Sequence, residues 1–223
     1  MLMVKAVIFD WDGTLADTRK AVVQSFQKVL TEAGCRVSDE FIARRMGIGT
    51  KKTIIEAFRE CRMRLDVSTL EKLADEKVRI QAGLADIVSL FGGATELLEA
   101  LQGKTKIVLA TMSGRKVVDK LLPAKRIAKY FDVVVSADEV ANPKPDPEVF
   151  LVAAKKLGVA PEDCVVVEDS VFGVRAAKAA NMKCIAVPSG AYSKEELEQE
   201  QPDLMIDSLL EKEKILKFIF GSK

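Results

Sequence analysis

The sequence contains no histidine among its 223 residues. This absence excludes a Ser-His-Asp triad, a Cys-His pair, a phosphohistidine and every metal centre that needs an imidazole ligand. Any catalytic proton transfer must therefore use Asp, Glu, Lys, Tyr or Cys.

Long apolar runs and an excess of charge are also missing. No stretch approaches the ~18 apolar residues of a membrane-spanning helix, and the N-terminus lacks the basic segment of a signal peptide. The 34 Lys and Arg residues balance 33 Asp and Glu residues, for a net charge of +1. Because no overall field favours nucleic acid or a membrane surface, we expect neither as a partner.

The four cysteines, Cys35, Cys61, Cys164 and Cys184, are far apart and form no CxxC pair. This pattern is typical of reduced, mostly structural thiols. We therefore expect a cytoplasmic protein.

Apolar, β-branched runs recur along the chain, each followed by a polar stretch that suits the start of a helix. The expected strands are 4–10, 106–111, 132–137, 164–169, 184–188 and, more weakly, 203–207. Several are almost continuously hydrophobic, as in parallel strands covered on both faces. Helical patterns between them cover roughly 117–130, 147–157, 172–180 and 194–200, with Pro147 at a first helical position. This alternation predicts a doubly wound α/β domain with a parallel sheet.

Residues 18 to about 90 interrupt that alternation, because they carry helical periodicity and no convincing strand. Glycines separate the helical stretches. The sequence therefore predicts an α/β core formed by residues 1–17 and 91–223, with an all-helical domain inserted at 18–90.

The first expected strand ends in a cluster of negative charge. Asp10, Asp12 and Asp17 lie within eight positions in "VKAVIFDWDGTLAD". The later strands are followed by residues that bear on the same chemistry: Thr111, Ser113, Lys144, Glu168 and Asp169. All of these segments share one rim, because parallel strands end at the same edge of a sheet, where ligands bind. Clustered carboxylates suit a hard divalent cation such as Mg²⁺, and the hydroxyls and lysine suit a phosphate.

Four segments, "DWDGTLADT", "LATMSG", "NPKPDP" and "VVVEDSVFGVRAAKAANM", together resemble the motifs of the haloacid dehalogenase superfamily. The resemblance is to the subgroup with a helical cap between the first two motifs, and it covers nearly the whole chain. It implies that Asp10 is the nucleophile that forms an aspartyl-phosphate, and that Asp12 is the general acid and base.

The same resemblance assigns the remaining site residues. Thr111, Ser113 and Lys144 would bind the phosphoryl group. Asp10, the backbone carbonyl of Asp12, and Asp169 would hold Mg²⁺, with Glu168 as a further ligand or a supporting partner. The chemistry agrees, since a carboxylate can attack phosphorus and no step requires histidine.

The residues favour a phosphatase over its relatives. The dehalogenase branch lacks the second aspartate of the first motif, which is Asp12 in this chain. The β-phosphoglucomutase relatives use a cap histidine and a cap arginine, and "GIGT" at 47–50 contains neither. A phosphonate-cleaving relative uses a cap lysine, and Lys20, Lys51 or Lys52 leave that alternative open. A receiver-type signalling module fits poorly, because it is about half as long and has no helical insertion. A silent binding protein is disfavoured because all four motifs are present.

Substrate choice is expected to lie in the cap, where basic residues surround the pair Gly47 and Gly49. Together with Lys51 and Lys52, these glycines are the predicted substrate contacts, although a solvated helix face explains each lysine equally well. A small anionic leaving group such as glycolate fits this loop best. We therefore expect a phosphoglycolate phosphatase-like enzyme, with phosphatases of sugar phosphates and nucleoside monophosphates as alternatives.

Overall fold

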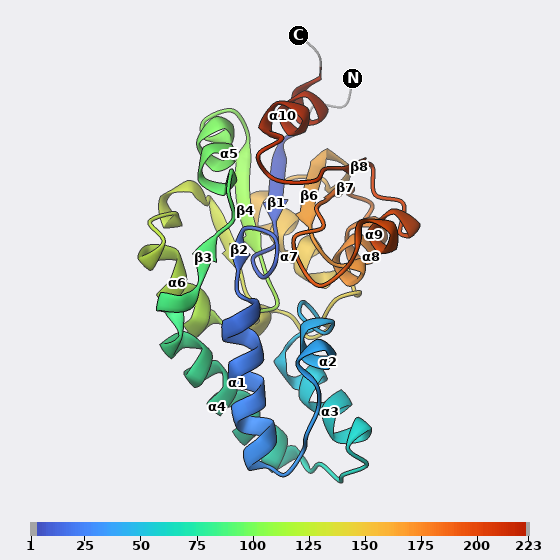
Figure 1. Cartoon of the computed structure of the whole chain (residues 1–223). Helices are drawn as coiled ribbons and strands as arrows, with labels where there is room; N and C mark the ends of the chain where they lie inside the picture. Colours follow the sequence, from blue (N-terminus) through green and yellow to red (C-terminus); the bar gives the residue numbers. More distant parts are fainter. Residues whose placement is uncertain (1–3, 222–223) are drawn as a thin grey trace.

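The computed structural model describes residues 4–221 of the chain. Its centre is a six-stranded parallel sheet in the order β5-β4-β1-β6-β7-β8 (Figure 1). The strands are β1 (Ala6–Phe9), β4 (Lys106–Ala110), β5 (Val133–Val135), β6 (Cys164–Glu168), β7 (Lys183–Ala186) and β8 (Leu204–Met205). All six strands expected from the sequence are present, and they end short of the expected bounds.

Helices cover both faces of this sheet. They are α5 (Ala94–Leu101), α6 (Arg115–Ala124), α7 (Glu148–Leu157), α8 (Val171–Ala179), α9 (Lys194–Gln199) and α10 (Lys212–Phe220). Val7 and Phe9 of β1 pack in one buried cluster with α5, α6 and α10, whereas Ala6 and Ile8 pack in a second cluster with α7, α8 and α9. The alternate side chains of one strand thus serve two layers, which confirms the doubly wound fold.

The helical insert follows β1 and consists of α1 (Arg19–Glu32), α2 (Asp39–Ala43), α3 (Thr50–Glu60) and α4 (Val67–Gly83). It has its own buried cluster, which includes Phe26 of α1 and Ile54 of α3. The chain leaves and re-enters the core through a two-stranded antiparallel ribbon of β2 (Ala16–Asp17) and β3 (Ser89–Leu90). In Figure 1 the insert lies below the carboxyl ends of the core strands.

Several elements differ from the sequence expectations. The helix expected at 117–130 ends at Ala124, because the chain turns through Arg126 in the left-handed region (φ 59°). Pro147 is the N-cap residue of α7 rather than its first helical residue. Helices α5 and α10 and the β2–β3 ribbon were not expected. Single 3-10 turns complete the structure at Ala85–Ile87, Ala128–Tyr130, Ala137–Glu139 and Pro161–Asp163.

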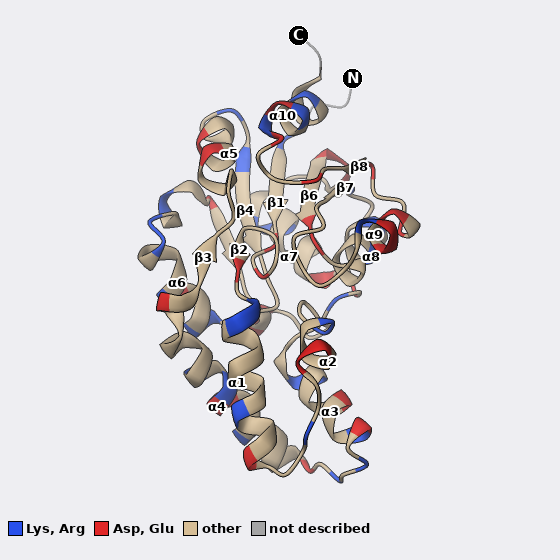
Figure 2. Cartoon of the chain, in the orientation of Figure 1, with Lys and Arg blue, Asp and Glu red and all other residues tan. Residues whose placement is uncertain are grey.

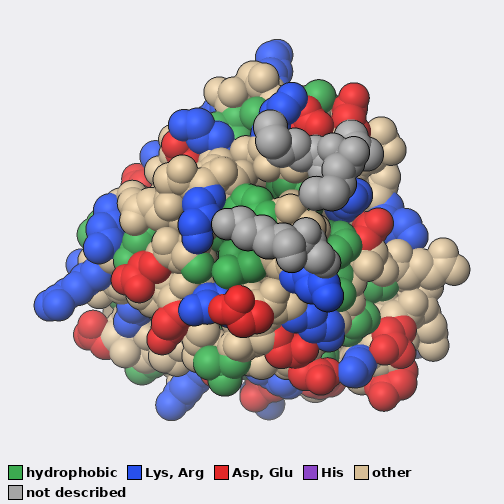
Figure 3. All heavy atoms as spheres, turned by 90° about the horizontal axis from the view of Figure 1, so that it is seen from above, with side chains coloured by type: hydrophobic (Ala, Val, Ile, Leu, Met, Phe, Trp, Pro, Cys, Tyr) green, Lys and Arg blue, Asp and Glu red, His purple; other side chains and the backbone are tan. Residues whose placement is uncertain are grey.

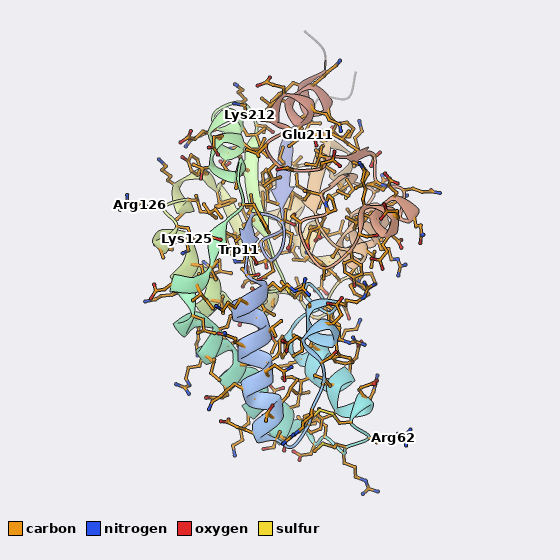
Figure 4. All side chains as sticks on the ribbon, in the orientation of Figure 1. Trp11, Arg62, Lys125, Arg126, Glu211 and Lys212 are labelled. Atoms are coloured by element: carbon orange, nitrogen blue, oxygen red, sulfur yellow. A yellow bond between two sulfur atoms is a disulfide. The ribbon has the colours of Figure 1, made fainter. Side chains whose placement is uncertain are left out.

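The cysteine prediction is partly wrong. Cys35, in the loop after α1, and Cys61, at the end of α3, are joined by a disulfide, while Cys164 and Cys184 are free and buried. Figure 4 labels the neighbouring Arg62 at the tip of the insert farthest from the core. The pairing spans 26 residues and joins the loop after α1 to the end of α3, so no local motif indicated it. Cysteine usage therefore no longer supports a reducing compartment.

Basic and acidic residues are interspersed along both the insert and the core (Figure 2). The end of the molecule that carries both termini likewise shows interspersed basic and acidic side chains (Figure 3). Within residues 4–221, every helix is too short or too polar to span a bilayer.

Candidate active site

The sheet brings the sequence-predicted polar residues to one buried rim. Asp10 directly follows β1, Thr111 follows β4, and Glu168 is the last residue of β6. Each of these side chains is almost fully buried, as are Lys144 and Asp169. The rim faces the helical insert, so the charged groups lie between the two parts of the molecule.

Lys144 ties two of the acidic residues together. Its Nζ lies 2.6 Å from Asp10 Oδ1 and 2.5 Å from Glu168 Oε1, and its side chain is fully buried. Burial alone would lower the pKa of Lys144, but the charges of Asp10 and Glu168 outweigh it and raise the pKa above its ordinary value. The lysine therefore stays protonated and supplies one positive charge to the rim.

One positive charge does not balance the acidic residues around it. Oxygens of Asp10, Glu168 and Asp169 lie within 4.8 Å of one another, and we call these three residues the acidic rim. Burial, with Glu168 adding to it, raises the pKa of Asp10 and of Asp169, although Lys144 opposes both shifts. The donor set is composed of oxygen atoms with an excess of negative charge, which fits a hard divalent cation.

Two glycines allow the backbone to approach Asp169 closely. A Cβ at Gly190 would lie 1.8 Å from Asp169 Oδ2, and a Cβ at Gly13 would lie 2.2 Å from the same atom. Gly13 also adopts φ +90°, which L side chains rarely take. Thr14 donates a hydrogen bond of 2.8 Å to Asp169 Oδ1. The Asp169 carboxylate is therefore held in a narrow space by backbone on two sides.

Glu168 uses both of its oxygens within the protein. Oε1 contacts Lys144, while Oε2 accepts hydrogen bonds from the backbone N–H groups of Asp169 and Ser170 and from the Ser170 hydroxyl, at 3.0–3.2 Å. This arrangement fixes the carboxylate at the end of β6 and the start of α8.

Asp12 lies in a different environment from Asp10, although only one residue separates them. Its Oδ1 accepts from the Thr18 hydroxyl at 2.7 Å. Its Oδ2 accepts from the Ser113 hydroxyl at 2.6 Å and the Thr111 hydroxyl at 3.3 Å. Three neutral donors therefore hold Asp12, whereas a lysine holds Asp10. Thr18, the residue before α1, closes the segment "DWDGTLADT", but the sequence analysis did not single it out because nothing in the sequence showed that its hydroxyl turns back to Asp12.

A small cavity of about 20 Å³ separates Asp12 and Ser113 from the insert. Gly47 and Gly49, two of the predicted substrate contacts, line it from the insert side. The core side is completed by Met112, which follows β4.

Lys77 of α4 also lines this cavity and was not predicted from the sequence. Its side chain is buried, its Nζ lies 2.5 Å from Gln81 Oε1, and it lies 4.4 Å from the centre of the Phe26 ring. Burial lowers the pKa of Lys77 to about 8, although the charge of Asp12 opposes the shift. A buried cation thus faces Asp12 across the cavity.

The two predicted cap lysines lie elsewhere. Lys51 forms an exposed ion pair of 2.7 Å with Glu71. Lys51 and Lys52 line a wider cleft of about 380 Å³ between the insert and the loops that follow β4 and β5, next to Gly49. A further groove of about 550 Å³, lined by Lys5, Lys104 and Phe131 among others, contains none of the predicted site residues.

Known proteins share this fold and are similar to this chain in sequence. The model of the family described as haloacid dehalogenase-like hydrolase matches residues 7–187. The phosphorylated carbohydrates phosphatase of Thermotoga maritima is 33% identical, over 82% of this chain and 84% of its own length. The phosphoglycolate phosphatase of Escherichia coli O157:H7 is 31% identical, over 92% of this chain and 90% of its own.

Two further comparisons bear on length and fold. The chloroplastic protein SUPPRESSOR OF QUENCHING 1 of Arabidopsis thaliana is 34% identical over 92% of this chain, but the match spans only 20% of that longer protein. The crystal structure of a hydrolase from Pseudomonas syringae superposes with a TM-score of 0.87 at 27% identity, covering 97% of this chain and 99% of that one. The matched family, the buried acidic rim and the helical cap inserted after β1 show that the chain belongs to the haloacid dehalogenase-like hydrolases, as a phosphatase of small phosphorylated metabolites.

Proposed function

We propose that the protein hydrolyses a small phosphate monoester, phosphoglycolate or a close analogue, through an aspartyl-phosphate on Asp10. The observation that carries this proposal is the unequal environment of the two neighbouring aspartates. Lys144 contacts Asp10 at 2.6 Å and opposes the rise that burial causes in the pKa of Asp10, whereas three hydroxyls donate to Asp12. Two carboxyls with different surroundings can take different roles, one as nucleophile and one as acid and base.

In the first step an Asp10 carboxylate oxygen attacks phosphorus, and the bond from phosphorus to the leaving alkoxide breaks. Protonated Asp12 gives its proton to that alkoxide. The Lys144 ammonium offsets the charge of Asp10 and of the phosphoryl oxygens, so that two anions can approach. The Thr111 and Ser113 hydroxyls donate to Asp12 in this structure, and we propose that they turn to the phosphoryl group when it binds.

In the second step the ionised Asp12 removes a proton from water, and the resulting hydroxide attacks phosphorus. The bond between phosphorus and Asp10 breaks and inorganic phosphate leaves. Asp12 is then protonated and Asp10 is ionised, as at the start. The roles of Asp12 in the two steps are reversed, as general acid–base catalysis requires.

The carboxylates of Asp10 and Asp169 and the backbone carbonyl of Asp12 are the proposed ligands of Mg²⁺. Glu168 has both oxygens occupied by Lys144 and by backbone N–H groups, which supports a positioning role for it. When bound, the cation would supply positive charge to the phosphoryl oxygens during transfer.

Removal of divalent cations is expected to abolish activity. The acidic rim carries more negative charge than Lys144 can balance, so an incoming phosphate would be repelled without a cation. Activity on an aryl phosphate should be measured after exhaustive chelation and again after adding back Mg²⁺ or Mn²⁺. Unchanged turnover in the chelated enzyme would contradict the proposed metal requirement.

Features of the helical insert, the cap, support the proposal that the leaving group is small and anionic. The cavity between Asp12 and the cap is only about 20 Å³, and Lys77 is the buried cation on its cap side. Its ammonium could pair with a carboxylate that lies a few atoms from the phosphate ester, as in phosphoglycolate. Gly47 and Gly49 are proposed to contact the substrate where they line the cavity, and Lys51 and Lys52 in the adjoining cleft are proposed to meet larger or entering substrates.

Substituting Lys77 is expected to change substrate choice more than catalysis. In Lys77→Met, kcat/KM for phosphoglycolate should fall roughly 10–100-fold, the cost of about 1.5–3 kcal/mol for a lost charged hydrogen bond. Turnover of p-nitrophenyl phosphate should change little. The selectivity of the wild-type enzyme for anionic substrates should also decline as pH rises through about 8, because Lys77 then loses its charge.

Lys72→Met is the matched control, since Lys72 lies on the same helix but is exposed. An equal loss on both substrates would contradict a role in specificity. A panel of sugar phosphates and nucleoside monophosphates, assayed with the same variants, separates phosphoglycolate from these alternatives. The similarity to a phosphorylated carbohydrates phosphatase makes the sugar phosphates the first alternative to assay.

The ribbon of β2 and β3 lies where the chain passes between core and insert. We therefore propose it as the boundary between the catalytic core, 1–17 and 91–223, and the cap, 18–90.

A further inference from the structure

One short segment contacts both the acidic rim and the cap. Residues 189–192, Ser-Gly-Ala-Tyr, follow β7 and lead into α9. None of them belongs to the four motifs, and the mechanism above uses none of them. We call this stretch the Ser189–Tyr192 segment.

At its first end the segment packs against the acidic rim. The Ser189 hydroxyl donates a hydrogen bond of 2.6 Å to the carbonyl of Gly13. Gly190 lies so close to Asp169 that a Cβ would be 1.8 Å from Oδ2. Gly13 is itself fixed between Asp12 and Thr14, and Thr14 donates to Asp169. Movement of the segment here would therefore change the surroundings of the proposed metal ligands.

At its other end the segment is joined to the cap. The Tyr192 hydroxyl donates a hydrogen bond of 2.6 Å to the carbonyl of Arg44, the residue that follows α2. The Arg44 guanidinium lies 4.6 Å from the centre of the Tyr192 ring and forms a two-pronged contact of 2.6 and 3.4 Å with Glu196 of α9. In Figure 1, α2 faces α8 and α9 at this junction.

Packing alone does not hold the segment in place. Ser189, Gly190 and Ala191 border a cavity of about 210 Å³, which Met46 and Arg19 of the insert also line. With open space on one side, the position of the segment depends on its hydrogen bonds at the two ends. Tyr192, in contrast, is buried and meets the Phe172 ring edge-on, with ring centres 6.2 Å apart.

We propose that the Ser189–Tyr192 segment is a positioning element that couples docking of the cap to the geometry of the acidic rim. Two residues separate the serine that holds Gly13 from the tyrosine that holds the cap. A cap docked on Tyr192 therefore favours the arrangement in which Gly13 and Asp169 are correctly placed. By linkage, occupation of the acidic rim by a cation favours the docked cap. This inference rests on the proposed function, because it assigns the acidic rim to a divalent cation.

Manganese binding, measured by electron paramagnetic resonance without substrate, tests the coupling directly. Ser189→Ala should weaken Mn²⁺ binding about fivefold, the loss expected for one hydrogen bond. Tyr192→Phe, which changes only the contact with the cap, should weaken it about threefold. The double variant should lose less than the product of the two, because both changes break the same connection. Ser189→Thr should restore binding, since it keeps the hydroxyl.

Tyr130→Phe is the control, because Tyr130 is the other tyrosine and its hydroxyl bonds to Glu99, away from the acidic rim. It should leave Mn²⁺ affinity unchanged. Thermal unfolding measured on each variant identifies any that fails to fold, and if Ser189→Ala is one of them, Tyr192→Phe carries the test. If Tyr192→Phe binds Mn²⁺ as the wild type does, or if the two changes multiply independently, the coupling is refuted. Intact coupling in a protein that hydrolyses no phosphate ester would refute only the proposed function.

Discussion

Asp10→Asn is expected to abolish turnover of every phosphate ester. An amide is not a nucleophile toward phosphorus, and the substitution also removes one proposed metal ligand. The variant should remain folded, because the asparagine oxygen can still accept from Lys144 and because one of three mutually repelling carboxylates is removed. Steady-state assays with an aryl phosphate, together with a thermal melt of the variant, test both statements.

Asp17→Asn is the matched control for that loss. Asp17 belongs to the same opening motif, but its side chain is exposed and, within residues 4–221, accepts only from the backbone N–H of Arg19. The control should retain wild-type activity. Activity of Asp10→Asn within tenfold of the wild type would contradict its assignment as nucleophile.

Asp12→Asn is expected to slow turnover by ~10²–10⁴-fold, the usual contribution of a general acid and base. The backbone carbonyl proposed to bind the cation is unchanged. The Ser113 and Thr111 hydroxyls can turn to accept from the new amide N–H groups while the Thr18 hydroxyl still donates to the amide oxygen, so the local structure should be kept. The loss should depend on the leaving group. Alkyl phosphates need protonation of a basic alkoxide, whereas aryl phosphates need little.

The comparison of the two ester types therefore separates the two roles of Asp12. For aryl phosphates, the first displacement should stay fast and the second should become slow, so that a burst of phenol precedes a slow steady state. For alkyl phosphates both displacements should be slow and no burst should appear. Equal losses on both ester types, without a burst, would assign Asp12 a purely structural role.

The sequence predicted the core well because buried parallel strands leave a strong signal. The almost continuous apolar run of "CVVVE" in β6 is fully buried, and the similar runs of β1 and β4 also become central strands of the sheet. The β2–β3 ribbon could not be predicted, since two residues per strand are too few to show alternation. Helix α10 was missed because its charged residues mask a buried face that includes Ile215.

The location of the acidic rim could be predicted from one physical rule, that parallel strands end at a shared edge. The rule places Asp10, Lys144 and Asp169 together without knowledge of side-chain positions. Contacts across the cap required the structure itself. Helical periodicity placed Lys77 within a helix but could not show that it faces Asp12, because α4 packs against α1 on one side and α6 on another. The Cys35–Cys61 disulfide could not be predicted either, because it joins two segments that only the folding of the insert brings together.

Locating the phosphoryl group on the protein distinguishes this mechanism from its rivals. Asp12→Asn enzyme is mixed with Mg²⁺ and an aryl phosphate, quenched in acid within milliseconds to seconds, and digested for mass spectrometry. We expect one modified peptide, with the phosphoryl group on Asp10, and no modification in the Asp10→Asn, Asp12→Asn double variant. A phosphoryl group on Thr111 or Ser113, or a modification that persists in the double variant, would contradict the assignment of Asp10 as the nucleophile.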